Sequence, residues 1–464
     1  MKKTKIVCSI GPSSNKYEVF KEMVLAGMNV ARINFSHATI EERETVVNLV
    51  KEANKELKRN IAVMYDTKGP DFRTGLVENG NIQLIEGNTI KIVKEDIIGN
   101  QEQITVNYKH CLDSININDT ILLEDGLMKL SVFEKTNEYL NCKIIAGGNL
   151  GNRKGINVPG VDLNVKFLSE QDIEDIKYAC HNNGDFLALS FVSCAEDVIS
   201  VRNLIKNENS NMKIISKIES FNAINNIDEI IDASDGIMVA RGDLGVEIPM
   251  QELPIIQKTI IKKCREKGVF CIVATEMLAS MSKNARPTRA EVSDVANAVL
   301  DGADAIMLSG ETTTGKFPID AVSYMASIAE NTEKYTEKSN VELNNYQDDE
   351  EIIAASATNA ANNLNASAIL VGTKSGKSAK LISNLRPKSI IIASCTSEQT
   401  AIDLAFYYGV HTTVVPEFND IDDMIAHIKE NAKENFNLNN QDKVIVTGGF
   451  PITKGTNFLK IEEI

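Results

Sequence analysis

Short apolar runs, typical of buried β-strands, alternate with segments of helical periodicity along most of the chain. Eight such runs, each followed by a helical segment, predict a (β/α)8 barrel rather than an open, doubly wound sheet. The expected strands are Lys5–Ile10, Asn29–Phe35, Ile61–Thr67, Phe186–Val192, Lys213–Ile218, Gly236–Val239, Val269–Ala274 and Ala305–Leu308. The expected helices cover residues 17–26, 41–58, 170–181, 195–207, 221–231, 251–267, 288–300 and 318–335.

The barrel rhythm is interrupted by residues 71–159, where short β-rich pieces are separated by Gly, Asn and Asp. Gly69-Pro70 and Pro159-Gly160 flank this stretch, which we interpret as a small inserted β-barrel domain that acts as a hinged lid. A polar linker over 333–351 leads to renewed strand and helix alternation, which predicts a separate α/β domain over 345–464. The barrel itself is expected to take residues 1–70 and 160–335.

Charge and composition exclude several classes of protein. The formal net charge is −15, which disfavours a nonspecific nucleic-acid binder. No apolar run is long enough to span a membrane, and the apolar core near the start is too short for a secretory signal. The eight cysteines include no CxxC pair, so buried reduced thiols are expected. These features predict a cytoplasmic enzyme.

In a (β/α)8 barrel the catalytic side chains come from the carboxyl ends of the strands. Lys217 and Glu219 lie two residues apart on a strand, so both are expected to face the barrel mouth. With Asp243 after the next strand, Glu219 offers hard oxygen ligands to a divalent cation. The competing interpretation is a structural Lys217–Glu219 ion pair.

Further polar residues at the strand ends fit an anionic ligand and a monovalent cation. Arg32 and Arg73 are suited to bidentate phosphate binding, although either can be an ordinary surface arginine. Gly242, after Arg241, allows close backbone approach to a ligand or simply a tight turn. Four oxygen-bearing residues form a candidate monovalent-cation site, for which ordinary capping hydrogen bonds are the alternative: Asn34, Ser36, Asp66 and Thr67.

A phosphate-binding loop is also predicted in the last domain. The segment Gly372–Ser378 joins a strand to a helix but does not match the P-loop register, since position 371 is Val. Its hydroxyls, lysines and helix-start amides suit a phosphate, whereas the alternative is a capped helix start. The candidate effector residues are Thr373, Lys374, Ser375, Gly376, Lys377 and Ser378.

Six segments, spread in order over the chain, resemble the pyruvate kinase family. They are Met28–His37, Asp66–Pro70, Ser216–Glu219, Met238–Glu247, Pro287–Asp294 and Met307–Thr312. The resemblance implies a barrel, a lid and a C-terminal regulatory domain in a homotetramer. It also implies phosphoryl transfer from phosphoenolpyruvate to ADP, giving pyruvate and ATP as the final step of glycolysis.

Carried over by motif, the resemblance gives roles to single residues. Glu219 and Asp243 would hold Mg²⁺ or Mn²⁺, and Lys217 would neutralise charge on the transferring phosphoryl group. Arg32 and Arg73 would bind the phosphate, and Thr275 would lie near the carbon that is protonated. The substrate carboxylate would be received by Ala240, Arg241, Gly242 and Asp243. The K⁺ site of the family is matched by Asn34, Ser36, Asp66 and Thr67. The nucleotide would be contacted by Arg32, Asn34, His37, Arg73 and Lys154. A sugar-phosphate effector is implied at residues 373–378.

Three positions depart from the usual family pattern without removing a catalytic group. Asp71 stands in place of Glu, Glu276 in place of Gln and Ala38 in place of Gly. Two other functions remain open at this point. One is a metal-dependent lyase that cleaves a carbon–carbon bond through an enolate on the same barrel, and the other is a sensor that binds sugar phosphate without catalysis.

Overall fold

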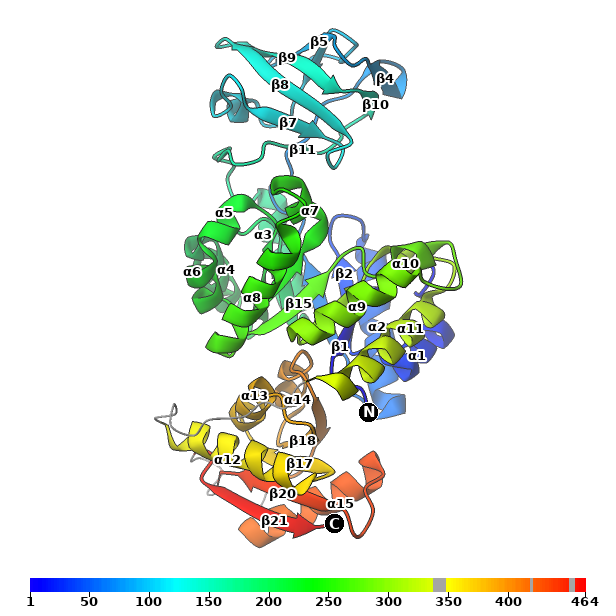
Figure 1. Cartoon of the computed structure of the whole chain (residues 1–464), viewed down its shortest axis with the longest axis vertical. Helices are drawn as coiled ribbons and strands as arrows, with labels where there is room; N and C mark the ends of the chain where they lie inside the picture. The colour runs from blue at the N-terminus through cyan, green and yellow to red at the C-terminus, as the bar shows by residue number, and fades with distance from the viewer. Residues whose placement is uncertain (337–347, 418–419, 450–454) are drawn as a thin grey trace.

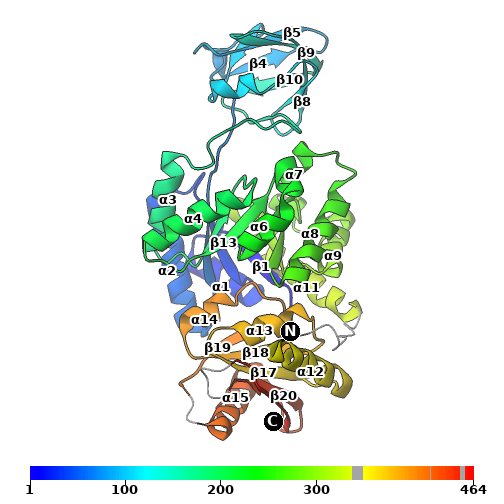
Figure 2. The same cartoon turned by 90° about the vertical axis from the view of Figure 1, so that its left-hand side faces the viewer.

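The computed structural model describes residues 1–336, 348–417, 420–449 and 455–464. Three bodies follow one another along its long axis, with the β-rich insertion at one end, the barrel in the middle and the C-terminal α/β part at the other end (Figures 1 and 2). Within the described ranges, no helix combines the length and apolar character needed to cross a lipid bilayer.

The central body is a closed barrel of eight parallel strands, which confirms the predicted fold class. The sheet order is β1-β16-β15-β14-β13-β12-β3-β2, and β2 closes the barrel on β1. The strands are β1 (Lys5–Ser9), β2 (Val30–Asn34), β3 (Ala62–Asp66), β12 (Phe186–Leu189), β13 (Lys213–Ile218), β14 (Gly236–Ala240), β15 (Phe270–Ala274) and β16 (Ala305–Leu308).

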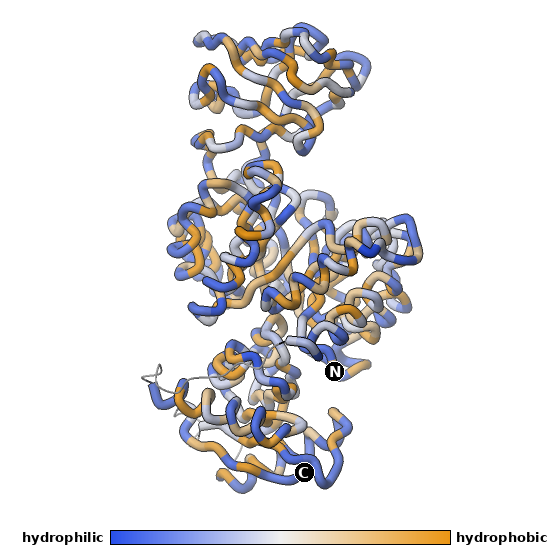
Figure 3. The backbone as a smooth tube through the Cα atoms, in the orientation of Figure 1, coloured by the Kyte–Doolittle hydropathy of each residue, from blue (hydrophilic) through white to orange (hydrophobic). Residues whose placement is uncertain are grey.

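Helices surround the barrel and bury one face each against it. Their starts are well capped: Thr39, Ser169 and Thr288 each form a capping box with the acidic residue three positions later. In Figure 3, hydrophobic and hydrophilic residues alternate along these helices, as expected for helices with one buried face. They are α1 (Tyr17–Ala26), α2 (Ile40–Leu57), α3 (Glu170–His181), α4 (Ala195–Asn207), α5 (Phe221–Asn225), α6 (Ile227–Ala233), α7 (Arg241–Glu247), α8 (Leu253–Lys267), α9 (Arg289–Asp301), α10 (Gly310–Thr313) and α11 (Pro318–Thr332).

The insertion after β3 forms two antiparallel-rich sheets around a hydrophobic core of its own. A six-stranded sheet has the order β11-β7-β8-β9-β5-β6, and β4 pairs with β10. The strands are β4 (Asn81–Leu84), β5 (Thr89–Val93), β6 (Gln103–Thr105), β7 (Thr120–Leu123), β8 (Met128–Lys135), β9 (Tyr139–Ala146), β10 (Gly148–Gly151) and β11 (Ile156–Asn157). The Asn157 side chain donates to Glu247 of α7 at 2.9 Å, which links this lid to the barrel rim.

The C-terminal part is a five-stranded sheet with helices, in the order β19-β18-β17-β20-β21. Only β21 runs antiparallel to its neighbour. The elements are α12 (Asp349–Leu364), β17 (Ala368–Thr373), α13 (Lys377–Asn384), β18 (Ile390–Cys395), α14 (Glu398–Asp403), β19 (Val410–Val414), α15 (Ile421–Phe436), β20 (Lys443–Gly448) and β21 (Phe458–Glu463).

The barrel interior and the C-terminal part share one hydrophobic core. Phe406, which follows α14, stacks on Phe270 with a centroid distance of 4.7 Å and meets Phe186 edge-on at 4.7 Å. Both partners belong to barrel strands, so the C-terminal part closes the end of the barrel that lies away from the lid.

Three predicted elements of the barrel are interrupted or end more than one residue earlier than expected. The fourth barrel strand ends at Leu189 instead of Val192, because Phe191 adopts a left-handed backbone with φ +58°. The helix expected over 221–231 is interrupted at Asn226, and the one expected over 318–335 ends at Thr332 and continues as a 3-10 turn.

Candidate active site

Lys217 lies at the centre of the polar cluster in the barrel mouth. Its side chain is nearly buried, and its ammonium contacts Asp66 at 3.2 Å, Ser190 at 2.6 Å and Glu219 at 2.8 Å. Burial opposes the charged form, but the two carboxylates outweigh it and raise the pKa of Lys217 above its usual range. The lysine is therefore a permanent cation facing the mouth, and the ion pair considered from the sequence is also present.

Asp66 joins this lysine to Arg32. The Arg32 Nε atom donates to Asp66 Oδ2 at 2.7 Å, and its Nη1 atom donates to Ser9 at 2.7 Å. Burial alone would raise the pKa of Asp66, but Arg32 and Lys217 together hold it below its usual range. These three groups together carry one positive charge, which the Glu219 carboxylate beside Lys217 offsets unless a cation binds Glu219.

Glu219 and Asp243 provide the carboxylate oxygens of the predicted divalent-cation site. Glu219 is 1% exposed, and its burial raises its pKa to about 7, with Lys217 opposing and the charge of Asp243 adding to the shift. Burial likewise raises the pKa of Asp243. Two desolvated carboxylates that destabilise each other fit a divalent cation, which would offset their charge. Among the described residues no group of three or more His, Cys, Asp or Glu side chains is arranged for a metal.

The segment after β14 is fixed by hydrogen bonds to the segment after β15. Arg241 is nearly buried and forms a two-pronged pair with Asp294, with both N–O distances 2.7 Å, so its guanidinium is directed toward α9. The Gly242 amide donates to Thr275 Oγ1 at 2.8 Å. Thr275 itself has a left-handed backbone with φ +71°, a strained conformation typical of functional sites. The Arg241 side chain is thus engaged by Asp294 and by the Thr275 carbonyl oxygen.

The four candidate monovalent-cation residues lie at the neighbouring ends of β2 and β3. The Asn34 side chain accepts from the Ser36 amide at 2.9 Å, a local capping bond of the kind considered as the alternative. Thr67 accepts from Ser190 through both its hydroxyl and its carbonyl oxygen, at 3.1 and 2.8 Å. His37, also near this edge, is exposed.

The candidate residues of the lid are paired with lid neighbours rather than with the barrel cluster. Arg73 forms an ion pair with Asp71 and donates to the Arg153 carbonyl at 2.8 Å. Lys154 pairs with Glu124 at 2.5 Å. The structure therefore does not bring Arg73 or Lys154 into contact with Arg32 or Lys217.

In the C-terminal part, the predicted phosphate loop has ion pairs of its own. Lys374 lies 3.5 Å from Glu417, and Lys377 lies 3.0 Å from Glu350. The Gly376 amide donates to Thr373 Oγ1 at 2.9 Å, and Ser378 hydrogen-bonds Thr456. Ser375 Oγ accepts from the Lys377 amide at 3.4 Å. The sequence also predicts that the loop over 448–456 closes over these residues with Lys454 as a second cation, but Lys454 lies outside the described residues.

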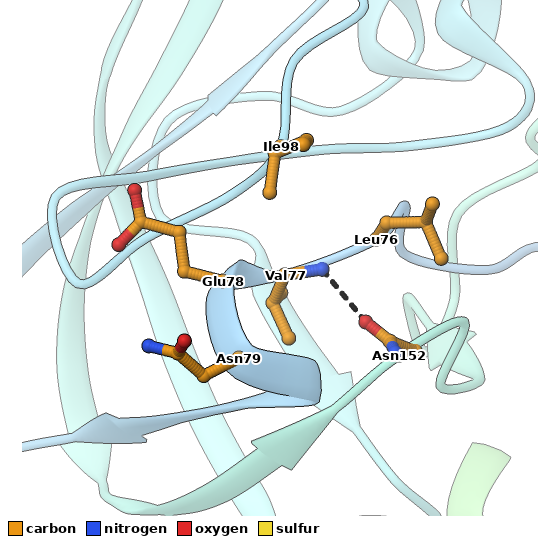
Figure 4. A pocket seen from close by; sticks show the side chains of 6 residues that line it. All are labelled: Leu76, Val77, Glu78, Asn79, Ile98 and Asn152. Carbon is orange, nitrogen blue, oxygen red and sulfur yellow. Dashed lines mark hydrogen bonds between the residues drawn. The ribbon is translucent and has the colours of Figure 1, made fainter.

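A surface hollow of about 390 Å³ lies on the lid, away from these clusters. Figure 4 shows its lining, in which the Val77 amide donates to Asn152 at 2.8 Å. Its charged residue is Glu78, and the others are apolar or amides. Because it has no cationic side chain, this hollow does not suit a phosphorylated substrate.

Comparison with known proteins identifies the relatives of this chain. Residues 1–322 match the family model for the pyruvate kinase barrel domain, and residues 351–462 match the model for the pyruvate kinase alpha/beta domain. The chain belongs to the pyruvate kinase family. Pyruvate kinase from Geobacillus stearothermophilus is 42% identical over 472 residues, covering 100% of this chain and 80% of the relative, and that from Sporosarcina psychrophila is 41% identical over 473 residues, covering 100% and 81%.

A solved pyruvate kinase structure has the same fold. The enzyme from Cryptosporidium parvum superposes with a TM-score of 0.95 at 38% identity, covering 100% of this chain and 96% of that chain. This protein is accordingly a phosphotransferase with pyruvate kinase activity, and neither the lyase nor the idle sensor is favoured.

Sequence reasoning missed two groups that hold the pyruvate kinase site together. Ser190 and Phe191 follow β12 and contact Lys217 and Glu219. Asp294 fixes Arg241 from α9. Ser190 and Phe191 could have been found from the rule that site residues follow the carboxyl ends of barrel strands, if the predicted strand had ended at Leu189. No charge pattern in the sequence pointed to Asp294.

Proposed function

We propose that this pyruvate kinase performs phosphoryl transfer with Lys217 as its main source of positive charge. The observation that supports this is the buried ammonium at the mouth, whose pKa the neighbouring carboxylates raise. Charge on the phosphoryl oxygens and on the developing enolate is stabilised best by a group that is already oriented and shielded from water. Arg32, anchored on Asp66 and Ser9, binds the phosphate beside it.

The other site residues, at the barrel mouth and in the lid, are given the following roles. Glu219 and Asp243 hold Mg²⁺ or Mn²⁺, which when bound supplies positive charge to the substrate carboxylate and phosphate. The backbone of residues 240–243 receives the carboxylate, and Thr275, hydrogen-bonded to Gly242, lies near the carbon that is protonated. Arg73, His37 and Lys154 approach the nucleotide together with Asn34 and Arg32. For Arg73 and Lys154 this requires the lid to close and their present ion pairs to open.

One assay tests this assignment. Phosphoenolpyruvate and ADP are supplied with and without Mg²⁺ and K⁺, and both pyruvate and ATP are measured. Equal amounts of pyruvate and ATP are expected, with no product when Mg²⁺ is omitted. Pyruvate without ATP would contradict phosphoryl transfer and return the lyase to consideration.

A K⁺ requirement is the first further prediction, with Asn34, Ser36, Asp66 and Thr67 as its oxygen ligands. Residue 71 is an aspartate. A lysine ammonium at this position could replace the positive charge of K⁺, but an aspartate cannot, so K⁺ itself is needed. We expect K⁺ to activate the wild type and Asp71→Lys to reduce that activation, measured in K⁺-free tetramethylammonium buffer with and without added K⁺.

Asp71→Asn is the matched control, because both variants remove the ion pair with Arg73 but only one adds a cation. Asp71→Asn should keep the K⁺ requirement. Full wild-type activity in K⁺-free buffer would rule out the cation site.

The second further prediction is that a sugar mono- or bisphosphate binds at residues 373–378 as an effector. The loop has hydroxyls, two lysines and helix-start amides, and its lysines are exposed and paired with carboxylates that an incoming phosphate would displace. We expect such a ligand to lower the half-saturating phosphoenolpyruvate concentration through about 1–3 kcal/mol of coupling. Lys374→Glu should abolish the shift and leave the maximal velocity intact.

Lys433→Glu makes the same charge change at an exposed position of α15 and should respond to the effector like the wild type. If no sugar phosphate shifts the saturation curve, the loop only caps its helix. The proposal also includes a homotetrameric assembly, which the family resemblance predicts, and a cytoplasmic location, which the composition predicts.

A further inference from the structure

Ser190, immediately after β12, lies between Lys217 and Thr67 at the barrel mouth. Its hydroxyl oxygen accepts from the Lys217 ammonium at 2.6 Å, the shortest of the three polar contacts that this ammonium makes. The side chain is buried, so water does not compete for the contact. This serine is therefore part of the immediate surroundings of the charge that acts on the phosphoryl group.

The contacts of the Lys217 ammonium account for all of its hydrogens. An ammonium has three N–H donors, and the acceptors are Asp66, Ser190 and Glu219. Glu219 is a ligand of the divalent cation in the proposed function, so a bound cation would compete with Lys217 for its oxygen. Asp66 and Ser190 would then fix two hydrogens and leave the third for the incoming phosphoryl group.

The serine hydroxyl has two acceptors for its own hydrogen, the Thr67 carbonyl oxygen at 2.8 Å and the more distant Asp66 Oδ1 at 3.4 Å. Donation to the nearer acceptor, Thr67, leaves an oxygen lone pair for Lys217. Since Ser190 is neutral, it orients the ammonium without drawing charge from it, as a third carboxylate would. A neutral acceptor at this place keeps the cation both aimed and electrostatically available.

The backbone around Ser190 is rigid as well. Its amide donates to Thr67 Oγ1 at 3.1 Å, and the next amide, of Phe191, donates to Glu219 Oε2 at 2.7 Å. A Cβ on Gly69, the first residue of the joint to the lid, would come within 3.0 Å of Ser190 Cβ. This close approach leaves the turn little room to shift.

We propose that Ser190 is a positioning residue for phosphoryl transfer, which aims the Lys217 ammonium at the substrate through its buried, hydrogen-bonded hydroxyl. It makes no contact with the reacting atoms itself. Its loss should therefore lower kcat, because the ammonium is free to settle on Asp66, and should leave substrate and metal binding nearly unchanged.

The test compares Ser190→Ala with Ser216→Ala. Ser216 is also a fully buried serine, one residue before Lys217 on β13, but its hydroxyl bonds Ser234 at 2.6 Å on the opposite face of the strand. Both variants lose one buried hydroxyl, so they should lower Tm by similar amounts. We expect Ser190→Ala to lower kcat about 10–100-fold, and Ser216→Ala to keep kcat within about twofold of the wild type.

Two further readouts separate positioning from general distortion. The KM for phosphoenolpyruvate and the dissociation constant for Mn²⁺, measured by electron paramagnetic resonance, should stay within about threefold in Ser190→Ala. A kcat loss no greater than that of Ser216→Ala, or a loss matched by equal rises in KM and in the Mn²⁺ constant, would overturn the proposal.

A second variant covers the case in which Ser190→Ala does not fold. Ser190→Cys keeps the size of the side chain but replaces oxygen with a weakly accepting sulfur. It should lower kcat in the same direction, and wild-type activity in this variant would also overturn the proposal.

Discussion

Lys217→Met should lower kcat by about 10²–10³-fold or more, with a much smaller rise in the KM for phosphoenolpyruvate. The substitution removes a preorganised cation that acts most strongly when charge develops on the phosphoryl group and the enolate. Steady-state rates over a range of phosphoenolpyruvate concentrations measure the two effects separately.

Lys213→Met is the matched control for this variant. Lys213 begins the same strand at the opposite end of the barrel, where it lies 3.7 Å from Asp403. It should keep kcat, although its ion pair with the C-terminal part is lost. Because Lys217→Met leaves Asp66 and Glu219 without a shared cation, its Tm should be compared with that of the wild type. A folded Lys217→Met enzyme with near-normal kcat would remove this lysine from the mechanism.

Asp243→Ala should weaken Mn²⁺ binding on the order of 10²-fold or more, since it deletes one of the two carboxylates proposed to hold the ion. Glu219→Gln should be milder and partly restored by additional metal, because the amide oxygen remains as a ligand. Direct Mn²⁺ titration by electron paramagnetic resonance measures both changes without relying on turnover.

Asp235→Ala provides the comparison for the metal experiment. Asp235 lies just before β14, at the end of the strand opposite to Asp243, and pairs with Arg202 at 3.0 Å. The Asp235→Ala variant should bind Mn²⁺ with the same affinity as the wild type. Unchanged affinity in both Asp243→Ala and Glu219→Gln would contradict the proposed site.

The barrel could be predicted from the sequence because the signals for its strands and helices are local and recur along the chain. Each strand is a short apolar run and each helix has a clear start, as at Ser169, so eight units could be counted across an insertion. The same reasoning placed Lys217 and Glu219 on one side at this strand end, and in the structure they form an ion pair there, with Glu219 directly after β13.

The hydrogen bonds that set the site depend on backbone geometry and on distant partners, which periodicity does not encode. The left-handed conformation of Phe191 ends β12 early, and an apolar residue gives no local sign of it. The partner of Arg241, Asp294, is 53 residues away on α9. Contact of Arg73 and Lys154 with the barrel cluster would depend on the position of the lid, which periodicity does not specify, and in this structure both residues are paired within the lid.

The continuous core beneath the barrel has a consequence for how the molecule melts. Phe406 contacts barrel phenylalanines directly, whereas the lid has a separate hydrophobic core. Cooperative unfolding follows the extent of a packed core, so we expect the barrel and the C-terminal part to unfold together and the lid to unfold separately. Loss of the C-terminal part would expose the barrel phenylalanines to water, whereas unfolding of the lid would leave that shared core intact.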